Sequence, residues 1–265
     1  MIERRKMKLL KLFLLLMIVT LSLYSKDKVL QQNFESSQIG KYSDKMVEQE
    51  WENIQWSSLF GRGEIVEDTD TNHAHILKIF YPKGSVGPNE GGGQFVVNIP
   101  PSDEYWLSYY VKFDENFDFQ LGGKLPGLTS GGEKYTGGHK PKNGEGWSAR
   151  FMWRENGKAV VYFYSVGMEG KWGDDLPLNK TFVLGKWHKI SQHIKVNEDD
   201  KANGILEVWL DSKKVMSRSD VLFRLGNLGL IDSFYFSTFF GGNTKDWGPD
   251  RDCFFSFNEF MVWTE

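Results

Sequence analysis

Apolar and polar residues alternate in short runs along most of the chain, and few stretches repeat with the period of a helix. The run Trp-Ser-Ala-Arg-Phe-Met-Trp-Arg at residues 147–154 is typical, and residues 106–113 are equally rich in aromatic side chains. A period of two with aromatic and β-branched residues indicates β-strands. The pattern predicts strands at residues 30–36, 74–81, 94–99, 106–113, 147–154, 159–166, 187–196, 205–210, 233–240 and 253–263.

Glycine clusters separate these runs and predict turns, for example at residues 91–93, 122–123 and 241–242. Only residues 219–225 indicate a short helix. Many short strands joined by turns favour a sandwich or jelly roll. We therefore predict an all-β fold, a β-jelly roll built as a concanavalin-like sandwich of two antiparallel sheets, in a single domain over residues 26–265.

The first 25 residues differ from the rest of the chain. Residues 1–8 are basic, and residues 12–23 are uncharged and mostly apolar. Because a membrane span needs about 20 apolar residues, this short run after a basic start predicts a secretory signal peptide over residues 1–25. An uncleaved membrane anchor is the alternative. We expect a secreted or periplasmic protein without a stable membrane span once the signal is removed.

The charge of the mature chain limits its partners. The full sequence has a formal net charge of −3, and residues 1–25 contribute +4 of it through five Lys and Arg side chains against Glu3, so the remainder carries −7. An acidic chain is not built to hold nucleic acid over its whole surface. The single cysteine, Cys253, excludes an intramolecular disulfide and a cysteine-type zinc cluster. We expect a monomer with no nucleic-acid partner, no metal and no cofactor.

A basic segment at residues 120–154 stands out in this acidic chain. It has only Glu133 and Glu145 as acidic residues, and His139 adds positive charge when it is protonated. Its basic residues are Lys124, Lys134, Lys140, Lys142, Arg150 and Arg154. A local cluster of cations points to an anionic ligand. The alternative is a solvated loop.

The strand pattern predicts which of these side chains share a face. One face of residues 147–154 is apolar, and the other carries Ser148, Arg150, Met152 and Arg154. In the next run, Tyr162 and Tyr164 share a face, and a short turn at 155–158 allows an antiparallel hairpin that places them beside Ser148 and Arg150. Arginine clasps carboxylates, and tyrosine transfers protons and packs on sugar rings. This hairpin predicts a surface for an acidic sugar; ordinary cross-strand pairs of aromatic and arginine side chains are the alternative.

Three motifs resemble polysaccharide lyase family 14: Gly-Gly-Lys-Leu-Pro-Gly-Leu at 122–128, Trp-Ser-Ala-Arg at 147–150 and Tyr-Phe-Tyr at 162–164. Further blocks extend the resemblance over most of the mature chain, at residues 61–66, 81–84, 92–95 and 239–242. The family comprises alginate and glucuronan lyases with a β-jelly-roll fold. The resemblance implies a lyase that acts on a polyuronate, alginate first and glucuronan second, with the catalytic residues Lys124, Ser148, Arg150, Tyr162 and Tyr164.

β-Elimination removes the C5 proton next to the uronate carboxylate, so the charge of that carboxylate has to be neutralised. We predict that Arg150 neutralises it, with Lys124 assisting and Ser148 donating a hydrogen bond. Tyr162 and Tyr164 would then supply base and acid, with a pKa lowered by the neighbouring cations. Lys124 is the alternative proton donor. The residues expected to contact the sugar chain are Gln94, His139, Lys140 and Arg154.

Other functions fit parts of the sequence. A non-catalytic carbohydrate-binding module for an acidic polysaccharide would use aromatics such as Trp172 and Trp247 and would not need the tyrosine pair. A glycoside hydrolase would need two suitably spaced carboxylates, and no strand motif supplies them. His73 and His75 are spaced to share a strand face, but polar surface is the more ordinary origin of such a pair.

Overall fold

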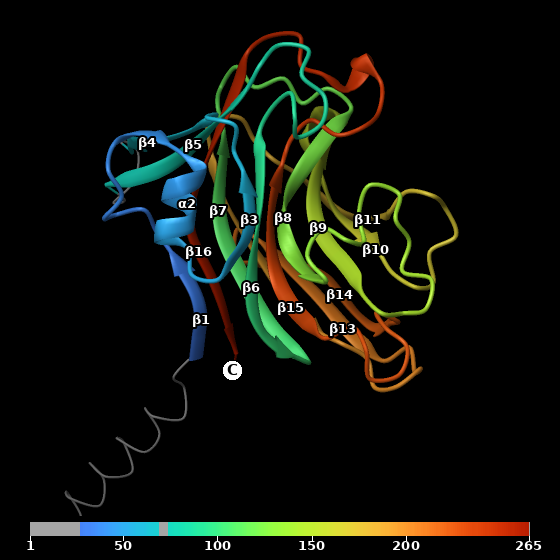
Figure 1. Cartoon of the computed structure of the whole chain (residues 1–265). Helices are drawn as coiled ribbons and strands as arrows, with labels where there is room; N and C mark the ends of the chain where they lie inside the picture. Colours follow the sequence, from blue (N-terminus) through green and yellow to red (C-terminus); the bar gives the residue numbers. More distant parts are fainter. Residues whose placement is uncertain (1–26, 69–73, 265) are drawn as a thin grey trace, which may run out of the picture.

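Two antiparallel sheets packed face to face make up the protein (Figure 1). The computed structural model describes residues 27–68 and 74–264. The nine-stranded sheet consists of β1 (Asp27–Gln32), β2 (Gly40–Tyr42), β4 (Gly63–Glu67), β5 (His75–Tyr81), β7 (Glu104–Phe113), β12 (Trp187–Lys195), β13 (Gly204–Leu210), β14 (Lys213–Val221) and β16 (Cys253–Thr264). The seven-stranded sheet consists of β3 (Ile54–Ser58), β6 (Gly93–Ser102), β8 (Gly122–Ser130), β9 (Trp147–Arg154), β10 (Lys158–Tyr164), β11 (Asp174–Thr181) and β15 (Ile231–Thr238).

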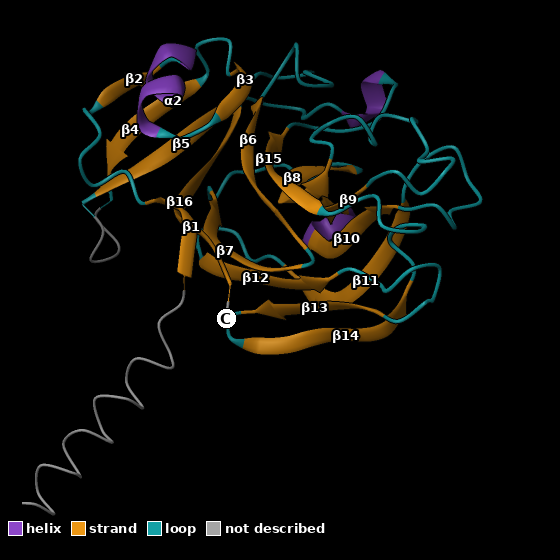
Figure 2. Cartoon of the chain, turned by 60° about the horizontal axis from the view of Figure 1, so that its bottom comes forward, coloured by secondary structure: helices purple, strands orange, loops and turns teal. Residues whose placement is uncertain are grey.

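The order of the strands differs from their order in the sequence. The seven-stranded sheet runs β11-β10-β9-β8-β15-β6-β3, and the nine-stranded sheet runs β14-β13-β12-β7-β16-β5-β4-β2, with β1 also paired to β16. Strands far apart in the sequence therefore lie side by side, such as β15 between β8 and β6 (Figures 1 and 2). These sheets confirm the prediction of an all-β antiparallel sandwich.

Helical structure is confined to short segments in the described residues. These are α2 (Asp44–Glu50) and two 3-10 turns at Glu155–Gly157 and Lys245–Trp247. Within the described ranges, no helix is long and apolar enough to cross a membrane. The predicted signal peptide over residues 1–25 lies outside the described residues, as does His73.

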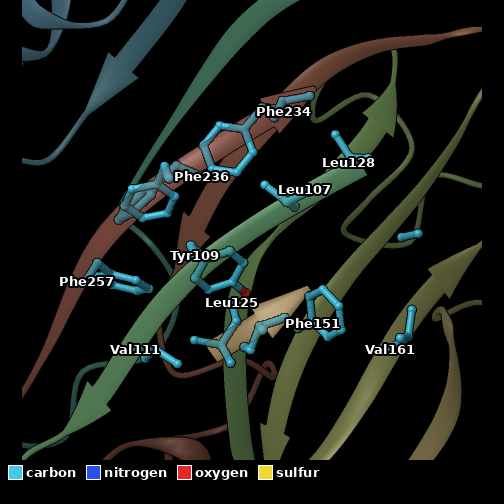
Figure 3. Close-up of a cluster of buried hydrophobic side chains, with 14 of the residues drawn as sticks. Leu107, Tyr109, Val111, Leu125, Leu128, Phe151, Val161, Phe234, Phe236 and Phe257 are labelled. Carbon is cyan, nitrogen blue, oxygen red and sulfur yellow. The ribbon is translucent and has the colours of Figure 1, made fainter. Parts of the chain in front are cut away.

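The inward faces of the two sheets form one core rich in aromatic side chains. Figure 3 shows side chains of β7 and β16 meeting those of β8, β9, β10 and β15. Burial of each large apolar side chain contributes roughly 1.5–3 kcal/mol. The apolar face predicted for residues 147–154 joins this core, since its four residues are buried there: Trp147, Ala149, Phe151 and Trp153.

Most predicted strands coincide with observed strands to within a few residues, and residues 147–154 match β9. The helix predicted at 219–225 is wrong, because these residues begin inside β14, a mostly exposed edge strand whose polar residues hide the alternation. The turn predicted at 122–123 is also wrong, because these glycines begin the buried strand β8. A Cβ on Gly123 would collide with the ring of Trp153, so packing accounts for the glycine.

A bulge at Pro126 divides β8 into two halves. Leu125 pairs with Phe151 and Gly127 with Arg150, so Pro126 is an extra residue in the ladder. The extra residue shifts the alternation of side chains by one position. As a result Leu125 and Leu128 both face the core, although they are three positions apart, while Lys124 faces outward.

Two side chains of the opposite sheet hold the backbone at this bulge. Tyr109 of β7 donates its hydroxyl proton to the carbonyl of Pro126 at 3.0 Å. Gln192 of β12 accepts from the amide of Leu128 at 3.2 Å and donates to the carbonyl of Ala149 at 2.8 Å. Both side chains are fully buried. At a bulge some backbone N–H and C=O groups lose their hydrogen-bond partners on the neighbouring strand. Water cannot reach these buried groups, so the two side chains supply the missing partners.

The substitution Tyr109→Phe tests the role of this contact. It leaves the carbonyl of Pro126 buried without its donor, and we expect a loss of about 1–3 kcal/mol in the free energy of unfolding, measured by urea denaturation. Tyr105→Phe is the matched control, because the Tyr105 hydroxyl also donates to a proline carbonyl but only in part-buried surroundings. Equal losses in the two variants would contradict a special role for Tyr109.

Candidate active site

Outward-facing residues of β8, β9 and β10 form one patch on the seven-stranded sheet. Arg150 lies directly opposite Tyr162, and Ser148 lies opposite Tyr164. On the other side of β9, Met152 is paired with Lys124. The predicted hairpin is therefore confirmed, and the residues predicted to be catalytic lie on three neighbouring strands (Figure 1).

Lys124 is a buried amine with no carboxylate at ion-pair distance among the described residues. Its Nζ lies 3.0 Å from Met152 Sδ and 4.1 Å from the centre of the Tyr162 ring. Burial, followed by the charges of Arg150 and Arg154, lowers the pKa of Lys124 well below its ordinary value. A desolvated lysine of this kind can act as a base near neutral pH.

Arg150 carries a second charge that no carboxylate in the described ranges balances. Its side chain is 1% exposed, and Nη1 donates to Ser237 Oγ at 2.8 Å. The guanidinium lies 5.1 Å from the centre of the Tyr235 ring, and Nε has no hydrogen-bond partner in the described part of the chain. Burial lowers the pKa of Arg150 below its ordinary value. An anion that reached this group would relieve an unfavourable desolvation.

The two phenols contact each other. The hydroxyl oxygens of Tyr162 and Tyr164 are 3.5 Å apart, and their rings meet edge to face at 5.4 Å between centres. Burial raises the pKa of Tyr162, and its contact with Tyr164 adds to this, so the lowering by Arg150 and Arg154 is outweighed. The expectation that neighbouring cations lower the tyrosine pKa is therefore wrong for Tyr162.

Ser148 is fully buried, and its hydroxyl is already engaged. Its Oγ donates to the carbonyl of Tyr135 at 2.7 Å. Tyr135 belongs to the connection between β8 and β9, residues 131–146, which we call the strap. In this arrangement Ser148 ties the strap to the sheet and has no proton left for a carboxylate.

Two residues predicted to contact the sugar chain lie at the patch. Arg154 forms a two-pronged ion pair with Asp175 of β11, at 2.8 and 2.5 Å, and its guanidinium lies 5.5 Å from the centre of the Tyr162 ring. Gln94 accepts from the hydroxyl of Tyr235 at 2.6 Å, so it lies beside the ring that Arg150 contacts. These residues extend the patch across the sheet from β11 to β6.

The other two predicted contact residues lie on the strap. His139 is exposed, and its Nδ1 is 2.9 Å from the carbonyl oxygen of Thr136. Lys140 reaches the connection between β10 and β11, residues 165–173, where its Nζ donates to the carbonyl of Glu169 at 3.0 Å. The structure therefore places both residues at the border of the patch rather than beside Arg150.

The strap and residues 165–173 cover the patch. The carboxylate of Glu133 accepts from Trp56 Nε1 at 3.0 Å, and the amide of Gly138 donates to the Tyr164 hydroxyl at 3.1 Å. Met168 packs in one cluster with both tyrosines. Tyr164 is 0% exposed as a result. The site is buried beneath surface loops on the outer face of a sheet and not between the two sheets.

The sequence analysis missed residues that β15 contributes. Tyr235 and Ser237 alternate with the core residues Phe234 and Phe236, so their outward direction was readable from the sequence. Their position beside Arg150 was not, because it depends on the pairing of β15 with β8. Across residues 27–68 and 74–264, no group of three or more His, Cys, Asp or Glu side chains is placed to hold a metal ion.

Known proteins are similar to this chain in both sequence and fold. The sequence model of the polysaccharide lyase 14 family matches residues 69–260. Alginate lyase Aly36B has a TM-score of 0.76 and 23% identity, over 91% of this chain and 98% of that one. The PL-14 alginate lyase of the marine Aplysia kurodai has a TM-score of 0.74 and 26% identity, over 90% and 99%.

A glucuronan lyase is also similar in fold. The endo-β-1,4-glucuronan lyase of the fungus Trichoderma reesei has a TM-score of 0.52 and 13% identity, over 86% of this chain and 95% of that one. A comparison with curated protein sequences gives no match. Because the family model spans well over half of the sequence and includes the motifs of β8, β9 and β10, the chain belongs to polysaccharide lyase family 14 and is a polysaccharide lyase.

Proposed function

We propose that this lyase cleaves a polyuronate by β-elimination and leaves a 4,5-unsaturated sugar at the new chain end. Alginate is the first candidate substrate, because the similar structures include alginate lyases, and variants of Aly36B have been solved with an alginate trisaccharide and tetrasaccharide. Glucuronan is the second, because of the similarity to a glucuronan lyase. The observation that carries the proposal is a pair of buried cations, without a carboxylate partner among residues 27–68 and 74–264, beside two phenols.

A uronate carboxylate fits the charge of this patch. Lys124 and Arg150 are both desolvated, and burial, followed by the charge of Arg150, lowers the pKa of the lysine. A carboxylate bound at the guanidinium of Arg150 would balance its charge through hydrogen bonds to preorganised donors, such as the unpartnered Nε. Neutral sugars gain nothing from this charge, so the patch favours acidic ones.

Lys124 is the proposed base and Tyr162 the proposed acid, and the directions of their pKa shifts support these roles. With its lowered pKa, Lys124 has a neutral fraction that takes the C5 proton, while Arg150 stabilises the carboxylate beside the developing carbanion. The electron pair forms the C4–C5 double bond, and the C4–O4 bond breaks. Tyr162, whose raised pKa keeps its phenol protonated, donates its proton to O4. A proton from the Lys124 ammonium then restores the Tyr162 phenol, and water is not consumed.

The remaining predicted residues act in support. Tyr164 contacts the hydroxyl of Tyr162 and fixes its direction. We assign Ser148 a positioning role, because its proton is donated to the strap. Arg154, held by Asp175 against the Tyr162 ring, is placed to receive the carboxylate of a neighbouring sugar. Export in a secreted or periplasmic form, with residues 1–25 as signal, belongs to the same proposal because a polysaccharide substrate lies outside the cell.

Three substitutions test the assigned roles. Lys124→Met removes the base, Arg150→Lys keeps a charge but loses the forked donors, and Tyr162→Phe removes the acid. We expect each to lower kcat by about 100-fold or more, measured by the ultraviolet absorbance of the unsaturated product with alginate and with glucuronan. Lys158→Met, at an exposed lysine that begins β10, should keep the wild-type rate. No absorbance change with either polymer would contradict the lyase proposal, and polymer binding without new chain ends would favour a binding module.

The pH profile separates a lysine base from a tyrosinate base. We expect kcat/KM to rise with pH through the lowered pKa of Lys124 and to stay high until Tyr162 ionises, above the ordinary value of about 10. A tyrosinate base would instead give a rate that rises only near or above pH 10. That second profile, measured on the wild-type enzyme, is the result that would reject Lys124 as the base.

Thermal stability tests the buried charge of Lys124 and does not depend on turnover. The folded pKa of Lys124 lies below the unfolded value, so between the two the unfolded state binds more protons and wild-type stability rises with pH. Lys124→Met removes this penalty, and its Tm should exceed the wild-type Tm at pH 7, by roughly 2–4 °C per kcal/mol gained. The difference in Tm between Lys124→Met and the wild type should become smaller as the pH approaches 10.5, the ordinary pKa of lysine. Lys158→Met should have the same Tm as the wild type. Identical Tm values for Lys124→Met and wild type at pH 7 would contradict a destabilising charge on Lys124.

A further inference from the structure

The patch is closed by two loops that meet above Tyr164. The strap brings the amide of Gly138 to the Tyr164 hydroxyl, at 3.1 Å. From the other side, residues 165–173 bring Met168 into the tyrosine cluster, and the backbone of Gly173 packs against the Tyr164 ring. In Figure 1 both connections project on the same side of the sheet, beside β10 and β11. Together they leave Tyr164 without exposed surface.

One side-chain hydrogen bond joins the two loops across this closure. It runs from Lys140 Nζ of the strap to the carbonyl of Glu169, at 3.0 Å. The Glu169 side chain is exposed and takes no part in the bond. The strap bends next to this contact at Gly137 and Gly138, whose φ angles of +60° and +90° favour glycine. The loops also touch where the backbone of Gly138 lies close to the side chains of Lys171 and Trp172, so the Lys140 bond acts together with this packing.

A polysaccharide cannot reach the Tyr164 hydroxyl while the loops are closed, because Gly138 is bonded to it and Tyr164 is 0% exposed. The acceptor of Lys140 is a neutral carbonyl, so this hydrogen bond is weaker than one to a carboxylate and opens more readily. In the open form a polyuronate can enter the patch. After the chain has entered, the loops can close again and return Gly138 to Tyr164.

We propose that Lys140 is a positioning residue that latches the strap to residues 165–173, rather than a direct ligand of the sugar chain. This inference rests on the proposed lyase function. The latch keeps the binding-competent open form rare in the free protein, which weakens apparent affinity by the open fraction. It also favours the closed form in which Gly138 orients Tyr164, and so supports turnover.

Lys140→Met and Lys142→Met together test the latch. Both remove one positive charge from the strap, but Lys142 is an exposed lysine and only Lys140 reaches Glu169. Relative to Lys142→Met, we expect Lys140→Met to lower KM for the polyuronate about three- to tenfold and to lower kcat by a similar factor. Lys140→Arg keeps a charged donor and should restore both values. A direct sugar ligand would behave in the opposite way, so a KM for Lys140→Met equal to or above that of Lys142→Met overturns the proposal.

Hydrogen exchange in the free protein provides a second readout that needs no turnover. We expect amides of residues 136–140 and 165–173 to exchange at least about threefold faster in Lys140→Met than in Lys142→Met. Equal exchange would overturn the latch even in an active enzyme. A wild-type protein without lyase activity would instead refute the proposed function, while the exchange comparison would still decide whether Lys140 holds the loops together.

Discussion

The bulge at Pro126 is the constraint on which both the core and the site depend. A regular strand would put Lys124 and Leu128 on one face, since they are four positions apart. With one extra residue in the ladder, Leu128 enters the core while Lys124 lies outside beside Met152. The bulge is stable because Tyr109 of the opposite sheet binds the freed proline carbonyl. Packing between the sheets therefore fixes the direction of the lysine that does the chemistry.

The electrostatics of the patch follow from its place under the loops. Solvent would screen Lys124 and Arg150 if the outer face were open, and their pKa values would be ordinary. Packed instead among Met152, Tyr162 and Tyr235, both cations are desolvated and lack a carboxylate among the described residues. The same burial acts on Tyr162 in the opposite direction. One physical cause thus makes the lysine the better base and the tyrosine the better acid.

The sequence predicted those features that depend on local pattern. The alternation in residues 147–154 predicted the two faces of β9, and the short turn predicted a hairpin with both tyrosines on the face of Ser148 and Arg150. Residues 122–123 show the limit, because a pair of glycines indicates a turn in the sequence but begins a buried strand in the structure. The contacts of Tyr109 with the bulge join residues that are 17 positions apart across the core, and no periodicity reveals them.

The degree of burial is the second property that the sequence does not predict. Cationic neighbours are visible in the sequence, but the amount of desolvation around them is not. The direction of the Tyr162 pKa was therefore predicted wrongly, and the sequence does not reveal the contacts of Ser148 with Tyr135 or of Lys140 with Glu169. The strap is held on the sheet by separate hydrogen bonds to Trp56, Ser148 and Tyr164, which residue types alone do not specify.

The most direct test of the central claim is the pKa of Lys124, measured by NMR titration of its labelled side chain in the Tyr162→Phe variant, which should not turn over substrate. The account predicts a value well below 10.5 in the free protein and a higher value once a polyuronate oligosaccharide is bound, because the carboxylate balances the buried charge. A lysine that titrates near 10.5 and does not respond to the oligosaccharide would contradict it.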